Sequence, residues 1–306
     1  VPGDGMNSHM LKRRNFLLVA LTAAGVLAAC DAPPDGRRAA DDDGQAGGPP
    51  SNVVALMRSL ADMWLLAGGT LAGITEDARD LEGVGDAQVV GSLSRPSLEQ
   101  IVALSPGLVL ATSDIPAQVE LRSSLVRQGI DCIDVDVNSL DDYASHMRRF
   151  CDTCGRDDLY QVNVADVVSA CDAVRARSKD LPEAKYLALR TSSAKSKALK
   201  QNHFACRIFD DLNMQNIADD GSSLDELSLE AIQAADPAYV FVIYQGDEDK
   251  AREAYEEGFS SRPAWQGLKA TLDGHVFVLP KELFQYKPNA RWADAYRYAL
   301  ELRSRE

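Results

Sequence analysis

The chain has 306 residues, a length that is sufficient for two domains of ordinary size. Hydrophobic residues make up 45% of the chain and charged residues 25%, which is typical of a globular protein with a core. The formal net charge is −14 at pH 7, which argues against a nucleic-acid-binding protein, because such a protein needs a basic surface for the phosphates.

The first predicted element is an export signal. The basic residues KRR at 12–14 precede an apolar stretch, NFLLVALTAAGVLAA, that is too short to span a bilayer comfortably. It ends in LAAC at residues 27–30, which looks like the lipobox of bacterial lipoproteins. The resemblance implies that Cys30 carries a lipid; an ordinary cleaved signal and an uncleaved anchor are the alternatives. We therefore predict a signal peptide over residues 1–29, in which the residues before Met10 are an over-long start.

A polar tether is expected next. Residues 31–50, DAPPDGRRAADDDGQAGGPP, contain Pro, Gly and Asp and almost nothing that a core would bury. We expect residues 30–51 to be a flexible tether that holds a folded domain off the outer face of the cell membrane.

The next hundred residues alternate between strand and helix patterns. Strands alternating with helices predict a parallel sheet with right-handed crossovers, and we assign residues 52–155 to an N-terminal lobe. The expected strands are 52–57, 71–75, 89–92, 108–113 and 132–137, and the expected helices are 59–69, 97–105, 116–129 and 139–155.

A single long helix is expected over residues 156–181. Apolar residues recur at helical spacing from Leu159 to Val174, and no Gly or Pro follows Arg156 until Pro182. This segment is predicted to bridge the first lobe to a second, similar lobe over residues 182–306. The strands expected there are 185–191, 238–246 and 275–280, and the helices are 203–213, 228–236, 248–259 and 289–305.

The predicted fold class is therefore α/β. It consists of two Rossmann-like lobes, each a mostly parallel sheet with flanking helices, joined by one long helix.

One decapeptide occurs in both lobes. Residues 97–106 read SLEQIVALSP and residues 228–237 read SLEAIQAADP, and an apolar run follows each copy. The serine of each copy is a predicted helix N-cap, and in the first copy a glutamine three residues later would complete a capping box. The glutamates Glu99 and Glu230 would then occupy the second helical position, where an acid interacts favourably with the helix dipole without any partner.

This arrangement resembles the substrate-binding proteins of ABC importers for iron complexes, haem and cobalamin. Three segments carry the resemblance, which extends over residues 52–303: RPSLEQIVALSPGLVLA, LSLEAIQAADPAYVFV and SRPAWQGLKATLDGHVFVLPKELF. It implies a monomeric, extracytoplasmic, membrane-anchored binding protein and not an enzyme. It also implies that Glu99 and Glu230, one on each lobe, meet arginines of a dimeric permease. Exposed ion pairs contribute only about 0.2–1 kcal/mol each, but two placed symmetrically would fix the orientation of docking.

The ligand is expected in the cleft between the lobes, beyond the carboxyl ends of the strands. The loop after Arg190, TSSAKSKALK, has no acidic residue although the protein is acidic, which favours an anionic ligand; a solvated basic loop is the alternative. Arginine binds carboxylate or catecholate oxygens in a bidentate manner, which suits a ferric siderophore or the propionates of haem; a corrinoid is the alternative. A tyrosine, Tyr286, would either ligate haem iron or pack against the ligand or the lobe. The predicted ligand-binding residues are Arg58, Ser59, Arg95, Arg190, Lys195, Lys197, Tyr244, Tyr286, Lys287 and Arg291.

Other classes of function have little support. The chain contains no G-x-S-x-G, P-loop, H-E-x-x-H or G-x-G-x-x-G motif, and its four histidines have no metal-binding spacing. We therefore expect no cofactor and no metal site. Cys151-x-x-Cys154 would suit a thiol-redox protein, but it ends a predicted helix, where small buried thiols are the other interpretation. One disulfide is possible among the five cysteines that follow Cys30, which are Cys132, Cys151, Cys154, Cys171 and Cys206.

Overall fold

A computed structural model describes residues 49–219 and 228–305. The predicted signal peptide and Cys30 lie outside the described residues. Within the described ranges, no helix is both long enough and apolar enough to cross a membrane.

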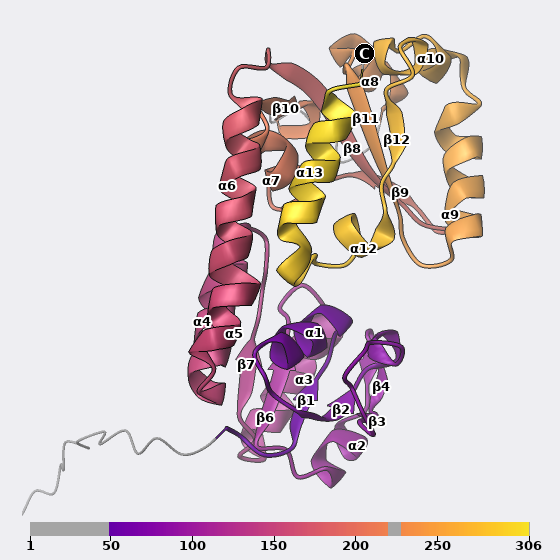
Figure 1. The fold of residues 1–306 in the computed structure, drawn as a ribbon. Helices are drawn as coiled ribbons and strands as arrows, with labels where there is room; N and C mark the ends of the chain where they lie inside the picture. The colour runs from indigo at the N-terminus through magenta and orange to yellow at the C-terminus, as the bar shows by residue number, and fades with distance from the viewer. Residues whose placement is uncertain (1–48, 220–227, 306) are drawn as a thin grey trace, which may run out of the picture. The chain divides into compact units, whose positions relative to one another are not determined.

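The N-terminal lobe is a five-stranded parallel sheet with the strand order β3-β2-β1-β6-β7 (Figure 1). Its strands are β1 (Val53–Ala55), β2 (Leu71–Ile74), β3 (Gln88–Val89), β6 (Leu108–Ala111) and β7 (Cys132–Asp134). Its helices are α1 (Arg58–Leu66), α2 (Leu98–Ala103), α3 (Pro116–Arg127) and α4 (Leu140–Cys154), with a short 3-10 turn η1 (Glu76–Ala78). A separate antiparallel hairpin pairs β4 (Gly91–Ser92) with β5 (Arg95–Pro96).

The C-terminal lobe has a parallel sheet of order β10-β8-β11-β12, with β9 added antiparallel to β8. Its strands are β8 (Ala184–Thr191), β9 (Ser196–Ala198), β10 (Met214–Asn216), β11 (Tyr239–Tyr244) and β12 (Val276–Val278). Its helices are α7 (Phe204–Asp211), α8 (Leu229–Ala235), α9 (Glu248–Tyr255), α10 (Pro263–Gln266), α11 (Lys269–Leu272), α12 (Lys281–Phe284) and α13 (Trp292–Arg303). Three further turns are η3 (Ile217–Asp219), η4 (Glu256–Ser260) and η5 (Asn289–Arg291).

The two lobes share one strand order. The series β2-β1-β6-β7 corresponds to β10-β8-β11-β12, so the repeated decapeptide begins the equivalent helix–strand step in each lobe, α2–β6 and α8–β11. The predicted fold class is confirmed.

The predicted N-caps of the repeat are also confirmed. The Ser97 hydroxyl oxygen accepts a hydrogen bond from the Gln100 N–H at 3.3 Å, and the Ser228 hydroxyl accepts one from the Ala231 N–H at 3.4 Å. The predicted capping box is wrong, because the Ser97 N–H that it needs donates to the Val90 carbonyl instead, at 2.7 Å.

The bridging helix is continuous but not regular. It consists of α5 (Asp157–Tyr160), a π-helical turn η2 (Gln161–Ala165) and α6 (Asp166–Ser178). Inside the π turn, the Asn163 carbonyl accepts a hydrogen bond from the Tyr143 hydroxyl, and the Asn163 side chain donates to the Leu66 carbonyl, each at 2.9 Å. A π turn leaves carbonyl groups without their helical partners. The Tyr143 hydroxyl of α4 supplies a partner for the Asn163 carbonyl, and the Asn163 side chain in turn binds the Leu66 carbonyl of α1. The expectation of an uninterrupted α-helix is therefore wrong at this turn.

One hydrophobic cluster joins the inner helices of both lobes to the bridge. It contains Trp64 and Phe150 of the N-terminal lobe, whose ring centroids are 5.4 Å apart, and Phe209 and Trp292 of the C-terminal lobe. Val174 of α6 is buried within the same cluster, and α6 lies beside α13 (Figure 1). Because protein cores are packed like solids, this shared core resists large independent movement of the lobes.

Several short elements differ from the sequence prediction. The strand expected at 89–92 is divided, because Gly91 adopts φ +117° and the chain turns there into the β4–β5 hairpin. The strand expected at 132–137 ends at Asp134. Strands β9 and β10 were not predicted, since neither contains the apolar run that marks a buried strand.

Candidate functional site

The carboxyl ends of the N-terminal strands are held together by one buried glutamine, Gln118 of α3. Its side-chain amide donates to the carbonyls of Leu56 at 2.7 Å and Leu93 at 3.2 Å, and its oxygen accepts from the Thr112 N–H at 3.1 Å. These groups lie after β1, in the β4–β5 hairpin and after β6. Because a buried main-chain group without a partner is costly, Gln118 fixes the three loops relative to one another.

Asp136 supports the same rim. Its carboxylate accepts hydrogen bonds from the Thr112 hydroxyl at 2.6 Å, from the Ser113 N–H at 2.9 Å and from the Ser113 hydroxyl. Burial alone would raise the pKa of Asp136, but the hydrogen bonds from Ser113 and Thr112 and the charge of Lys287 hold this pKa below its usual value. The next residue after Ser113, Asp114, is left facing the opposite lobe.

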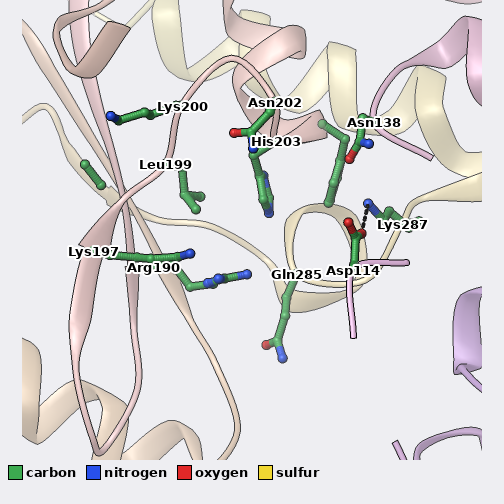
Figure 2. A pocket seen from close by; sticks show the side chains of 12 residues that line it. Asp114, Asn138, Arg190, Lys197, Leu199, Lys200, Asn202, His203, Gln285 and Lys287 are labelled. Atoms are coloured by element: carbon green, nitrogen blue, oxygen red, sulfur yellow. Dashed lines mark ion pairs between the residues drawn. The ribbon is translucent and has the colours of Figure 1, made fainter. Parts of the chain in front are cut away.

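The rim of the C-terminal lobe is the basic β8–β9 hairpin. Arg190 and Lys197 are directly opposite each other in the antiparallel register, so their side chains leave the same face of the sheet. Figure 2 shows both side chains extending into a common cavity. Like charges placed opposite each other destabilise a strand pair, and an anion between them would offset that cost.

The cavity has a volume of about 430 Å³ and is lined from both lobes (Figure 2). The C-terminal lobe supplies all four basic residues, whereas Asp114 is the single acidic residue of the lining and comes from the N-terminal lobe. The lining residues are Asp114, Asn138, Arg190, Lys197, Ala198, Leu199, Lys200, Asn202, His203, Phe204, Gln285 and Lys287. This excess of positive charge suits a ligand with anionic oxygen atoms.

Lys287 reaches from the C-terminal lobe to the N-terminal lobe. Its ammonium nitrogen donates to the Val137 carbonyl at 2.5 Å, and it lies 3.9 Å from the Asp114 carboxylate and 5.1 Å from the centre of the Phe204 ring. Burial lowers the pKa of Lys287, while the charge of Asp114 opposes the change. The lysine is therefore a connection between the lobes as well as a wall of the cavity.

Arg190 is also desolvated. Burial lowers the pKa of Arg190, and the carboxylate of Asp114 works in the opposite direction. Within the part of the chain that the structure describes, its guanidinium makes no ion pair. A partly buried cation of this kind gains stability when an anion binds beside it.

A second, smaller cavity of about 170 Å³ lies where the loop after α12 meets α1. Asn289 donates to the Ser59 carbonyl at 3.0 Å and to the Asp62 carboxylate at 2.7 Å, and the Lys287 N–H donates to the Ser59 hydroxyl at 3.3 Å. Burial raises the pKa of Asp62 despite the hydrogen bond from Asn289. This cavity is built mainly of contacts between the lobes.

Seven of the ten predicted ligand-binding residues line one or both of these cavities. Arg190, Lys197 and Lys287 line the larger cavity, and Arg58, Ser59, Tyr286, Lys287 and Arg291 line the smaller one. Arg58 is already paired with Asp80 at 2.5 Å and lies over the Tyr286 ring at 5.3 Å. Arg95, Lys195 and Tyr244 line neither cavity, and all ten assignments stay predictions.

Several lining residues were not among the ten predicted ligand-binding residues. Asp114 and Asn138 follow β6 and β7 and obey the rule that sites form beyond the carboxyl ends of strands. His203 and Asn202 follow the basic loop, directly before α7. Gln285 directly precedes the predicted pair Tyr286 and Lys287. The sequence signal for each of these residues was its closeness in the chain to a strand end or to a predicted binding residue.

The two glutamates of the repeat lie elsewhere. Glu99 and Glu230 are exposed in the first turn of α2 and α8, the equivalent helices of the two lobes, and neither lines either cavity. Their predicted role in docking to a permease stays a prediction.

The five cysteines that follow Cys30 are free thiols. Cys151 and Cys154 lie at the end of α4, which ends at Gly155, and burial raises the pKa of both thiols. A redox-active cysteine has a lowered pKa, so these thiols differ from that class. Among the described residues, no group of three His, Cys, Asp or Glu side chains is arranged to hold a metal ion.

Comparison with known proteins agrees with this geometry. The chain matches the periplasmic binding protein family over residues 53–283. The iron-uptake system-binding protein of Bacillus subtilis (strain 168) is 21% identical over 196 residues, which cover 63% of this chain and 61% of that protein, so the match spans less than two thirds of the relative.

Two solved structures have the same fold. IsdE of S. aureus, solved in complex with heme, is 16% identical with a TM-score of 0.73, covering 83% of this chain and 99% of that one. The periplasmic vitamin B12 binding protein BtuF of Vibrio cholerae is 19% identical with a TM-score of 0.69, covering 85% of this chain and 100% of that one. The resemblance inferred from the sequence is confirmed: the chain belongs to the periplasmic binding protein family.

Proposed function

We propose that the chain is an extracytoplasmic lipoprotein that captures an anionic iron complex in the larger cavity and delivers it to an ABC importer. The observation that carries this proposal is the concentration of Arg190, Lys197, Lys200 and Lys287 around one cavity in a protein with a net charge of −14. Such a cavity concentrates an anionic complex against the overall repulsion of the protein surface.

The chemistry of the lining favours a ferric siderophore with oxygen ligands over haem. A siderophore supplies its own iron ligands, so the protein has only to bind carboxylate or catecholate oxygens, for which Arg and Lys are suited. A haem would instead leave its iron without the expected tyrosine ligand, because Tyr286 lines the smaller cavity beneath the Arg58 guanidinium. The iron-uptake relative supports an iron complex, and the relatives solved with heme or named for vitamin B12 make haem and corrinoid the competing cargoes.

We propose that delivery of the cargo to the permease depends on the glutamates in the first turns of the two repeated helices. Glu99 and Glu230 are exposed at equivalent positions of the two lobes and would meet the two halves of a permease dimer, one acid on each half. A lipid on Cys30 would keep the protein close to that permease. Cys30→Ala should then release the protein from membranes, and a wild-type protein without lipid on Cys30 would contradict the anchor.

Identification of the bound cargo tests the proposal. Protein purified from its native host, with its bound cargo, is examined by absorption spectroscopy, metal analysis and mass spectrometry. We expect about one iron per chain and the charge-transfer band of a ferric siderophore. A Soret band would identify the cargo as haem, and a corrinoid spectrum would identify it as cobalamin. Either result would overturn the proposal that the cargo is a ferric siderophore.

A further inference from the structure

One imidazole in the larger cavity is held in a single orientation by the start of a helix. His203 is the N-cap of α7, and its Nδ1 atom accepts a hydrogen bond from the Ala205 N–H at 3.3 Å. The ring stacks on Phe204 with a centroid separation of 4.8 Å, and Figure 2 shows it extending into the cavity. Backbone capping and stacking therefore fix both the position and the rotation of this ring.

The capping contact also determines which nitrogen carries the proton. A neutral imidazole has one N–H and one lone pair, and a nitrogen that accepts a hydrogen bond uses the lone pair. Because Nδ1 accepts from Ala205, the proton of the neutral ring lies on Nε2. Within residues 49–219 and 228–305 this ring makes no second hydrogen bond, so the Nε2–H group is available to the cavity.

The surroundings keep the ring neutral. Lys287 follows α12, Arg190 belongs to β8 and Lys197 to β9, and all three line the cavity with His203, where Asp114 is the single acidic residue. Burial lowers the pKa of His203 to about 3, with further contributions from Lys287, Arg190 and Lys197. Burial and the neighbouring cations therefore both favour the neutral ring.

We propose that His203 binds an oxygen atom of the cargo through a fixed Nε2–H group, as a neutral hydrogen-bond donor and not as an iron ligand. This proposal rests on the proposed function, because the cargo is the anionic complex described above. Ligation of iron by imidazole needs a lone pair on the nitrogen that faces the metal. Giving Nε2 that lone pair would move the proton to Nδ1, where it would face the Ala205 N–H and destroy the cap.

The tautomer is measured directly in the protein without added cargo. The imidazole nitrogens of the ¹⁵N-labelled full chain are observed by multiple-bond ¹H–¹⁵N spectra between pH 5 and pH 8. The chain has four histidines, and the signal that disappears in His203→Asn identifies this one. We expect the Nε2–H tautomer and no titration in this range. A proton on Nδ1, or an imidazolium with a midpoint inside the range, would overturn the proposal.

Two variants separate the donor from the cap. An asparagine is a good N-cap but does not reach the position of Nε2, so His203→Asn should keep the melting temperature of the wild type while losing the donor. A glutamine places an N–H group near the position of Nε2, so His203→Gln should bind better than His203→Asn. With gallium citrate as a diamagnetic anionic probe, we expect His203→Asn to raise Kd by about tenfold and His203→Gln to recover part of the loss.

The outcomes distinguish this proposal from the proposed function. Gallium citrate that shifts the signals of Arg190 and Lys197 but leaves the Nε2–H signal of His203 unchanged contradicts the donor role. A probe that shifts no signal in the cavity counts against the proposed class of cargo, and the tautomer measurement then decides the His203 proposal alone. Titration with hemin adds a further test: an imidazole-ligated spectrum that is lost in both variants would overturn the claim that His203 is not an iron ligand.

Discussion

The ammonium group of Lys287 donates a hydrogen bond to the main-chain oxygen of Val137, and this contact joins the two lobes at the edge of the larger cavity. A second connection lies nearby, where Asn289 bonds to the Ser59 carbonyl and the Asp62 carboxylate. The proposed cargo cavity and the relative position of the lobes therefore share one loop of the C-terminal lobe.

Small lobe movement on binding is the first prediction. The bridging helix, the shared core and the loop from Lys287 to Asn289 all connect the lobes, and interfaces packed in this way do not deform continuously. We expect the lobes to rotate by only a few degrees between the cargo-free and cargo-bound states. Small-angle scattering of both states checks this, and a rotation of tens of degrees would show that the bridge is a hinge.

A second prediction concerns the opposed cations of the β8–β9 hairpin. Arg190→Gln combined with Lys197→Gln should raise Kd for the cargo about a hundredfold, since each charged hydrogen bond is worth about 1.5–3 kcal/mol. Isothermal titration measures this quantity.

Lys185→Gln is the matched control for that pair. Lys185 is exposed at the other end of the same strand, β8, and lines neither cavity. Its substitution should leave Kd unchanged. An equal loss of affinity in the control would mean that the charge of the whole lobe, and not the cavity, attracts the cargo.

Gln118 should contribute strongly to stability. Gln118→Leu leaves the Leu56 and Leu93 carbonyls and the Thr112 N–H without their partner, and each buried unsatisfied group costs about 1–3 kcal/mol. We expect the free energy of unfolding to fall by about 2–4 kcal/mol in urea titrations. The exposed Gln233→Leu serves as the control, and a similar small change in both variants would argue against the network.

The two glutamates of the repeat should affect transport and not binding. In Glu99→Gln combined with Glu230→Gln, uptake by cells should be lost while Kd for the cargo stays at the wild-type value, because neither acid lines a cavity. The exposed pair Glu120→Gln and Glu253→Gln controls for lost negative charge. A parallel loss of affinity in the first double variant would place these acids in the binding site.

Asp210 should make stability depend on pH. Burial raises the pKa of Asp210 from 3.8 to about 6, although the hydrogen bond from the Tyr186 hydroxyl favours the ionised form. Between these values the folded protein holds a proton that the unfolded chain releases, so this group's contribution to the free energy of unfolding falls as pH rises from 4 to 6.

The variant Asp210→Asn removes that contribution. Relative to the wild type, we expect its free energy of unfolding to increase steadily from pH 4 to pH 6 and then to remain level. Urea unfolding at several pH values measures the difference, with the exposed Asp131→Asn as the control. A difference that is the same at every pH would show that Asp210 has an ordinary pKa when folded.

Elements with a strong local pattern could be predicted from the sequence. The buried strand β11 and the capped helices α2 and α8 depend on residues close together in the chain, such as Ser97 and Gln100. The strand β9 has no such pattern, since it forms only because β8 lies beside it. The π turn escaped prediction for a similar reason, as Asn163 bonds to Leu66, a residue 97 positions away.

The same distinction applies to the cavity. Arg190 and Lys197 could be proposed because a basic loop follows a predicted strand, and sites form at such ends. The proposed role of His203 depends on the direction of a ring that a helix N-terminus orients, and Asn138 lines the cavity together with residues of the other lobe. Neither relationship can be predicted from the neighbouring residues in the sequence.

The most direct test of the central claim is a crystal structure of the protein with its co-purified cargo, in which anomalous scattering locates iron. We predict one iron atom in the larger cavity, with ligand oxygens facing Arg190, Lys197 and Lys287. Iron in the smaller cavity or outside both, or a cargo without anionic oxygens, would contradict the proposal that this basic cavity captures an iron complex.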